Sequence, residues 1–407
     1  MRGAGLNARD RRRSVRAIAV PDTPFFSVII PTKNRSYRVA SALRSVLRQT
    51  FSSYEIIVVD NDDTAATADV VRQFTDPRIR YVRTGGLSMA DNWERGRQEA
   101  RGEYLKILPD RHLLKGWALE KVHQIVEQEK TPAISWRTGD IDDSDPQAAF
   151  FKLLYKQPAR TRTCRKLDSG VLLRRFLREG RRPIFDLLPR GINSACHRSL
   201  VKEIVDGPLG RLCPPVSPDY TMAFAQLAYS DTIVYLDETL NISCSGDSNG
   251  REFRTKAGSA GATFVRDTGT ANFYNRVPVK AVLTQNMLLN DFLNMQALLP
   301  EKLAAFPLSP VDYFVQVYAD IRLYELVGVK TGDDLRAWEA ALSEQPPDIQ
   351  AEVRAGIVPY ARRYALTLGN RVDYVWLQQA IRAYRKAKGP RFDSVLAALE
   401  WEEQTIG

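Results

Sequence analysis

Hydrophobic and polar positions in the first quarter of the chain alternate between strand-like and helix-like spacing. β-branched runs at residues 28–30 and 55–59 are typical of buried strands, and apolar positions at helical spacing predict a helix between them over residues 36–49. The alternation continues with predicted helices over 64–74 and 89–100 and predicted strands over 79–82 and 104–108. This order predicts a parallel α/β layer with right-handed crossovers.

The pattern is less regular in the middle of the chain and wholly helical at its end. Helices are predicted over 114–127, 199–205 and 219–229, and strands over 132–136 and 232–236. Residues 243–271 are rich in Gly, Ser and Thr and have little periodicity, so we expect a linker or a lid there. Further helices are predicted over 309–326, 333–343, 348–367, 372–388 and 393–402. Pro359 is expected to kink or split one of them.

These patterns divide the 407-residue chain into four segments. Residues 1–24 are expected to be a disordered basic tail, 25–245 an α/β domain, 246–276 a flexible loop or linker, and 277–407 a helical domain. The hydrophobic fraction of 44% is sufficient for a sizeable core.

The net charge of +10 is concentrated in one window. Residues 152–182 hold eleven Lys or Arg and two Asp or Glu, which gives +9 by subtraction. A local basic surface suits an anionic substrate or an acidic membrane surface better than a nucleic acid. The alternative is a solvated basic face without a ligand.

Cysteine usage and hydropathy indicate the compartment. The four cysteines have no CxxC spacing, which favours reduced thiols. The sequence has no run of about 18 apolar residues, and the basic N-terminus lacks the apolar core of a signal peptide. We therefore expect a cytoplasmic protein, either free or peripheral at the inner face of the membrane.

Polar residues follow the first two predicted strands. Thr32 and Asn34 come after the first strand, and Asp60 follows the second. Ligands of open parallel sheets lie beyond the carboxyl ends of the strands, so these residues should face one crevice. Asp60 either accepts hydrogen bonds from a nucleobase or ribose, or caps the following turn.

Two further acidic positions could carry chemistry. Asp110 and His112 follow the strand over 104–108 and could both point at one divalent cation that bridges a diphosphate, while Arg111 could neutralise phosphate directly. The alternative is a turn Asp beside an exposed His. Asp219 opens a predicted helix after Pro218, where it is either a general base or a plain helix cap.

Several common motifs are absent. Neither GxGxxG nor GxxxxGK[ST] occurs, which argues against a Rossmann dehydrogenase and a P-loop NTPase. Residues 246–250 match GxSxG, but no strand, helix or later His supports a nucleophile elbow.

Taken together, these residues resemble family 2 glycosyltransferases of the GT-A fold. Three landmarks carry the resemblance: SVIIPTKNR at 27–35, EIIVVDNDDTAAT at 55–67, and NWERG at 92–96 leading to ILPDRH at 107–112. The resemblance covers 26–114 well and 188–240 more weakly. It implies a Rossmann-like mixed sheet flanked by helices, followed here by an all-helical C-terminal region.

The resemblance also implies an inverting enzyme that transfers a sugar from a nucleotide-diphosphate donor to a hydroxyl group. Asp219 takes the position of the catalytic base. The implied donor-binding residues are Pro31, Thr32, Asn34, Asp60, Asn92, Asp110 and Arg111. The implied cofactor is Mn²⁺ or Mg²⁺ at Asp110 and His112.

The run Asp110-Arg111-His112 departs from the two or three acidic residues that the family usually has at this position. Three explanations are open: His112 replaces a carboxylate ligand, Arg111 makes the metal partly dispensable, or activity is lost. The first is favoured here, with Mn²⁺ preferred over Mg²⁺ because His suits it better.

We expect a glycan or lipid-linked acceptor in the biosynthesis of surface polysaccharides, and no nucleic-acid partner. The alternative function is a catalytically degenerate nucleotide-sugar-binding or scaffold protein. A nucleotidyltransferase is disfavoured because no Gly-rich basic loop follows the first strand. The helical region could cover the acceptor cleft, form a homo-oligomer or bind a partner enzyme.

Overall fold

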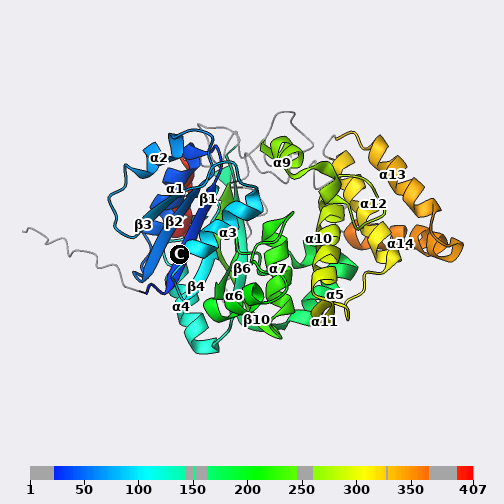
Figure 1. The fold of residues 1–407 in the computed structure, drawn as a ribbon, viewed down its shortest axis with the longest axis horizontal. Helices are drawn as coiled ribbons and strands as arrows, with labels where there is room; N and C mark the ends of the chain where they lie inside the picture. The colour runs from blue at the N-terminus through cyan, green and yellow to red at the C-terminus, as the bar shows by residue number, and fades with distance from the viewer. Residues whose placement is uncertain are drawn as a thin grey trace, which may run out of the picture.

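The computed structural model describes residues 23–143, 150–151, 163–244, 260–326, 329–365 and 392–406. Figure 1 shows a sheet with helices on both faces at one end of the molecule and helices alone at the other end. The strands are β1 (Phe26–Thr32), β2 (Tyr54–Asp60), β3 (Ile79–Arg83), β4 (Tyr104–Ile107), β5 (His112–Leu114), β6 (Ala133–Asp142), β7 (Phe150–Phe151), β8 (Cys164–Asp168), β9 (Ser194–His197) and β10 (Thr232–Cys244).

The helices of the α/β part are α1 (Ser36–Leu47), α2 (Ala66–Val71), α3 (Met89–Glu99), α4 (Ala118–Glu129), α5 (Ser169–Glu179), η1 (Arg182–Ile184), α6 (Arg198–Asp206) and α7 (Pro218–Ala228). The later helices are α9 (Ala260–Thr268), η2 (Thr270–Phe273), α10 (Thr284–Leu298), α11 (Pro300–Leu303), α12 (Pro310–Leu326), α13 (Gly332–Ser343), α14 (Pro347–Ala365) and α16 (Val395–Ile406).

The described strands form one mixed sheet in the order β3-β2-β1-β4-β9-β6-β10-β5, with β7 and β8 paired beside this path. Strands β1 to β4 are parallel where they pair, whereas β9 runs antiparallel to both β4 and β6. The predicted fold class, a mixed sheet flanked by helices and followed by a helical region, is confirmed.

Both faces of the central strands are covered, which explains their continuous apolar sequences. Val28 and Ile30 of β1 pack with side chains of α1 and α4, and Ile29 packs on the opposite face with Trp93 of α3. Gly102 precedes β4 where a Cβ atom would lie 2.5 Å from the backbone nitrogen of Ser27. The absence of a side chain at this position lets the chain enter the sheet.

Several predicted elements differ from the structure. Helix α2 is shorter than predicted, β5 was not predicted, and β10 extends eight residues beyond the expected Leu236 to Cys244. Thr239 interrupts the regular pairing of β10 with β6, and such an irregularity hides the strand period in the sequence. Pro359 lies inside a single assigned helix, α14, so the helix is not split. Predicted residues 372–388 lie outside the described residues.

The segment expected to be a loop over 246–276 contains helix α9. Phe264 of α9 packs edge-on against Phe273, with ring centroids 5.6 Å apart. This tertiary contact supports a helix that the sequence pattern did not predict. Residues 246–259 of this segment, and residues 1–22 of the predicted tail, lie outside the described residues.

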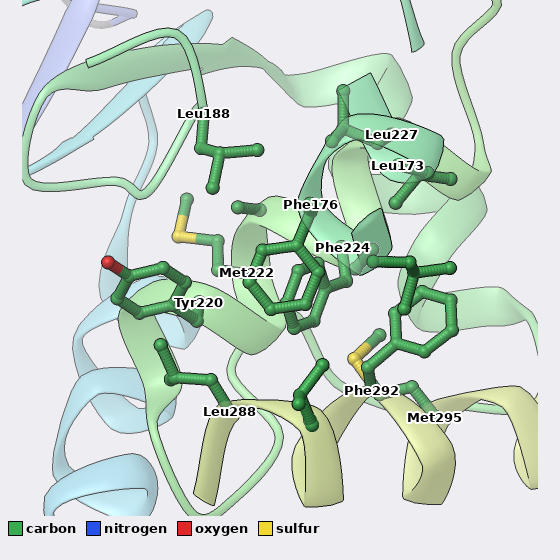
Figure 2. Close-up of a cluster of buried hydrophobic side chains, with 14 of the residues drawn as sticks. Leu173, Phe176, Leu188, Tyr220, Met222, Phe224, Leu227, Leu288, Phe292 and Met295 are labelled. Carbon is green, nitrogen blue, oxygen red and sulfur yellow. The ribbon is translucent and has the colours of Figure 1, made fainter. Parts of the chain in front are cut away.

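The hydrophobic core is continuous across residue 277, where the helical domain was predicted to begin. One cluster of buried side chains extends from β1 through α5, α7 and α10 to α14. Figure 2 shows Phe176 of α5, Phe224 of α7 and Phe292 of α10 gathered in this cluster. The centroid of the Phe224 ring lies 4.8 Å from that of Phe176 and 5.4 Å from that of Phe292. Helix α10 therefore shares its core with the α/β part.

The last helix leaves the helical region and packs against the sheet. Leu399 of α16 is buried with Leu113 of β5 and Ile242 of β10, and the red C-terminal segment lies behind the blue strands in Figure 1. Glu402 forms a buried ion pair with Lys115, with Nζ and Oε1 2.7 Å apart. The sequence placed this helix in the helical domain because its pattern carries no information on the partner.

Part of the basic window is used for internal ion pairs. Arg175 and Arg178 both pair with Glu179, and Arg181 lies 3.5 Å from the carboxylate of Asp320. Residues 152–162 of the window lie outside the described residues. Within the described ranges, no helix is both long enough and apolar enough to cross a membrane.

Candidate functional site

The loops that follow β1 and β2 are tied together at the carboxyl edge of the sheet. Asn34 adopts a positive φ of 56°, a conformation that Asn tolerates better than most residues. Its backbone N–H donates to the carboxylate of Asp62, and its side-chain amide exchanges hydrogen bonds of 2.7 and 2.9 Å with Asp63. The predicted residue Asn34 thus organises this edge.

Asp60 is fully buried at the end of β2, and its carboxylate is engaged by neighbouring groups. It accepts hydrogen bonds from the Tyr81 hydroxyl at 2.5 Å, from Arg83 at 3.2 Å and from the backbone N–H of Asp62 at 2.8 Å. Burial raises the pKa of Tyr81, and its hydrogen bond to Asp60 raises that pKa further. The turn-capping interpretation of Asp60 is therefore realised, and its contact with a nucleoside stays a prediction.

Thr32 and Asp110 are brought together although 78 residues separate them. The Thr32 hydroxyl donates to the Asp110 carboxylate at 2.8 Å, and the Arg35 Nε donates to the same oxygen at 3.0 Å. The Asp110 side chain is fully buried, whereas that of Arg35 is 16% exposed. Pro31, the other predicted residue on β1, is buried within the strand.

Asn92 lies next to the end of β2, where Thr84 connects it to the backbone carbonyl of Asp60. Its buried amide donates to the carbonyl of Val59 at 3.2 Å and accepts from the Thr84 hydroxyl at 2.8 Å. These bonds connect α3 to β2 and engage both ends of the amide. These bonds give Asn92 a structural role, and its predicted contact with the donor stays a prediction.

Arg111 and His112 point to different surroundings. Nη1 of Arg111 donates to the Ser243 hydroxyl at 3.2 Å and to the carbonyl of Cys244 at 3.3 Å. The His112 side chain is 1% exposed, so the alternative of an exposed His is wrong. Nδ1 of His112 contacts the amide nitrogen of Asn241 at 3.0 Å. Burial lowers the pKa of His112 well below its usual value, and nearby positive charges lower it further.

Asp219 lies in the first turn of α7, the position predicted for the base. Its side chain is 24% exposed, and a carboxylate oxygen lies 3.8 Å from Nη1 of Arg190. Burial raises the pKa of the Asp219 carboxyl, while the positive charges of Arg190 and Arg111 and the backbone N–H groups of the helix terminus oppose that rise. Asp219 is therefore an accessible carboxylate next to a cation, at the positive end of a helix dipole.

Arg190 is a site residue that the sequence analysis missed. It is 2% exposed, and its guanidinium carbon lies 3.6 Å from the centre of the Phe185 ring. Among the described residues, its Nε and Nη2 atoms have no hydrogen-bond partner. Its loop is held by buried Lys106, whose Nζ donates to the carbonyls of Gly191 and Ile192 at 3.0 and 2.7 Å. A lysine inside an otherwise apolar strand was the signal that could have pointed to this loop.

Asp291 of α10 is a second residue that the sequence analysis missed. It is completely buried and accepts hydrogen bonds from the backbone N–H groups of Val216 and Ser217, at 3.1 and 2.9 Å. Burial raises the pKa of Asp291 to about 6 despite these hydrogen bonds, and the charge of Asp219 raises it too. The helical region thus supports the turn that carries Asp219.

The residues predicted to bind a metal do not fit a divalent cation. Asp110 already faces the Arg35 guanidinium, and His112 receives the Asn241 amide at Nδ1. Within the described part of the chain, no three His, Cys, Asp or Glu side chains gather in a group that could hold a metal ion. We therefore derive no chemical step through a metal at Asp110 and His112.

Comparison with known proteins places the first part of this site in a family. The family model described as Glycosyl transferase family 2 matches residues 27–162. This part of the chain is a family 2 glycosyltransferase domain. The matched residues include Thr32, Asp60, Asp110 and His112 of the family 2 domain, whereas Arg190, Asp219 and Asp291 follow it.

Two relatives illustrate the likeness of the family 2 domain. The chain is 27% identical to the glycosyltransferase GlyG of Streptococcus pneumoniae over 130 residues, which are 31% of this chain and 42% of GlyG. It is 34% identical over 105 residues, 25% of this chain, to the GalNAc(5)-diNAcBac-PP-undecaprenol β-1,3-glucosyltransferase of Campylobacter jejuni. The match spans 34% of that relative. The structure of S. aureus TarS 1–349 with UDP aligns over 91% of this chain and 94% of its own, with 14% identity and a TM-score of 0.49.

Proposed function

We propose that the protein is an inverting glycosyltransferase that moves a sugar from a nucleotide-diphosphate donor to a hydroxyl of a glycan or lipid-linked acceptor. Residues at the carboxyl edge of β1, β2 and β4 bind the donor, and Asp219 is the general base. The single observation that carries the proposal is the place of Asp219: a partly exposed carboxylate 3.8 Å from a buried arginine, in a chain whose preceding domain belongs to family 2.

In the proposed reaction, Asp219 takes the proton of the acceptor hydroxyl while the oxygen of that hydroxyl attacks the anomeric carbon. A new carbon–oxygen bond forms, and the bond from the anomeric carbon to the diphosphate breaks on the opposite face. The nucleoside diphosphate leaves with the electron pair, which inverts the anomeric configuration. Burial raises the pKa of Asp219 and so makes its anion a stronger base once it is deprotonated. The positive charges of Arg111 and Arg190 stabilise negative charge in this region.

A lipid-linked acceptor and a role in surface polysaccharide biosynthesis are the finer parts of the proposal. The name of the Campylobacter jejuni relative states a PP-undecaprenol-linked substrate for that enzyme. By analogy, this protein acts in the cytoplasm or peripherally at the inner face of the membrane.

The test is a transfer assay with the full chain. UDP-, GDP-, TDP- and CDP-linked sugars are offered with a panel of undecaprenyl-diphosphate-linked acceptors, and the product anomer is read by NMR. We expect one donor to be used with inversion, and Asp219→Asn to lower turnover at least about a hundredfold while donor binding persists. Asp206→Asn, in an exposed pair with Lys202, is the matched control.

Retention of configuration, or undiminished turnover in Asp219→Asn, would refute the proposed mechanism. Donor binding without transfer to any acceptor would instead favour the nucleotide-sugar-binding scaffold.

A further inference from the structure

The imidazole of His112 is held in one tautomer by two buried side chains from neighbouring strands. Trp136 of β6 donates its Nε1–H to the side-chain oxygen of Asn241 at 2.6 Å. Because an indole nitrogen can only donate, this bond fixes the orientation of the Asn241 amide. The Asn241 amide nitrogen must then face Nδ1 of His112, 3.0 Å away, and donate to it.

A neutral imidazole that accepts a hydrogen bond at Nδ1 carries its proton on Nε2. Nε2 of His112 is therefore a donor, whereas a metal ligand needs a lone pair on that atom. His112 is 1% exposed, and among the described residues Nε2 has no hydrogen-bond partner. A buried donor of this kind is costly unless a ligand or another acceptor reaches it.

The charges around His112 favour an anion as that ligand. Burial lowers the pKa of His112, and the positive charges of Arg111, Arg190 and Arg35 lower it further, whereas burial also lowers the pKa of nearby Lys106. Of the nearby carboxylates, Asp110 is ion-paired with Arg35, and Asp219 lies beside Arg190. A divalent cation at Nε2 would find a donor hydrogen there instead of a lone pair and would be repelled by the adjacent Arg111 guanidinium, whereas a phosphate oxygen would be attracted.

We propose that His112 donates its Nε2–H to a phosphate oxygen of the nucleoside diphosphate, and that this site binds the diphosphate through cationic and neutral donors without a divalent cation. The inference rests on the proposed function and names how that site recognises its donor. Trp136 and Asn241 act as positioning residues because they set the tautomer and do not touch the ligand.

The tautomer can be measured without any ligand. The chain has three histidines, so ¹⁵N-histidine labelling gives three ring systems, and His112→Gln identifies the one of interest. We expect a protonated Nε2 and an unprotonated Nδ1 in the wild type. Asn241→Asp should reverse this, because a carboxylate accepts from both Trp136 and an Nδ1–H. A wild-type Nδ1–H tautomer would overturn the inference.

Calorimetry with UDP, GDP, TDP and CDP tests the ligand. We expect one nucleotide to bind with affinities that agree within about threefold in Mn²⁺ and in EDTA. His112→Leu should weaken that binding about tenfold, the loss expected for one hydrogen bond to a charged group. His112→Gln, whose amide can donate from nearly the same position, should restore most of it. Asn241→Asp should weaken binding in EDTA and make it depend on Mn²⁺.

The outcomes separate this inference from the proposed function. Wild-type binding that Mn²⁺ strengthens tenfold or more, and that His112→Gln abolishes, overturns the inference and leaves a nucleotide-dependent transferase intact. Failure of all four nucleotides to bind under either condition overturns both.

Discussion

The carboxylate of Asp291 accepts a 2.9 Å hydrogen bond from the backbone N–H of Ser217, two residues before Asp219. The partners lie 74 residues apart in sequence, one on α10 and one at the start of α7. Asp291 also accepts a hydrogen bond from the backbone N–H of Val216, and the two bonds together, called the Asp291 clamp below, fix this turn. The first helix of the C-terminal region is thus part of the support for the proposed base.

Asp291→Asn should weaken this clamp. Only one oxygen of the amide can accept, so one of the two backbone N–H groups would face another donor. We expect the free energy of unfolding to fall by about 1–3 kcal/mol and kcat to fall more than the donor KM changes. Urea unfolding and steady-state kinetics measure both effects. Glu301→Gln, at an exposed position of α11, is the control, and equal losses in the two variants would contradict the clamp.

Asp291 should also make stability depend on pH. Its pKa is raised in the folded protein from 3.8 to about 6, so the folded state binds the proton more tightly than the unfolded state. The stabilisation from this group is fully present below pH about 4 and is lost as the pH rises through about 6, by up to roughly 3 kcal/mol. Comparing unfolding of the wild type and Asp291→Asn across this range isolates the effect. A parallel pH dependence in both proteins would refute it.

Arg190→Gln should shift the pH–rate profile. The Arg190 cation opposes the rise in the pKa of Asp219, so its removal should raise that pKa further. Because the base must be deprotonated, the acidic limb of kcat/KM should move to higher pH. Arg198→Gln, which removes an exposed guanidinium bonded to the carbonyl of Ala100, should leave the limb in place. A shift to lower pH would contradict the assigned coupling.

Gly102→Ala should destabilise the entry to β4. The added Cβ would lie 2.5 Å from the backbone nitrogen and 2.7 Å from the carbonyl carbon of the adjoining β1 residues. Backbone cannot move aside as a flexible side chain can, so we expect a loss of about 1–3 kcal/mol. Gly116→Ala, where the nearest atom is 3.6 Å away, is the control for the same chemical change. Thermal unfolding of both variants measures whether Gly102→Ala loses more stability than Gly116→Ala.

Glu402→Ala should remove the carboxylate that forms the buried ion pair with the ammonium of Lys115. Removing one member of a buried ion pair costs about 3–5 kcal/mol, and the double replacement Lys115→Met with Glu402→Met should recover much of that loss. Glu400→Ala is the control, because its side chain is 49% exposed and 3.4 Å from Arg48. Urea unfolding of these three variants and the wild type tests the docking of α16 on the sheet. Equal effects of Glu402→Ala and Glu400→Ala would argue against that docking.

The sequence by itself determined the features that depend on local pattern. The runs at β1 and β2, the helix α3 and the helix that begins at Pro218 and carries Asp219 were all predicted, because period and strand ends are encoded in neighbouring residues. The meeting of the loops after β1 and β2 at one edge followed from the parallel order of the strands.

Only the tertiary structure decided what stands next to those residues. The clamp by Asp291, the Arg190 cation beside Asp219 and the return of α16 to Lys115 join positions that no local pattern relates. The clearest case is His112, which the sequence offered as a metal ligand. Its tautomer depends on Asn241, 129 residues away, whose orientation depends in turn on Trp136. Residue type supplies the donors and acceptors, and packing alone decides which atom carries the proton.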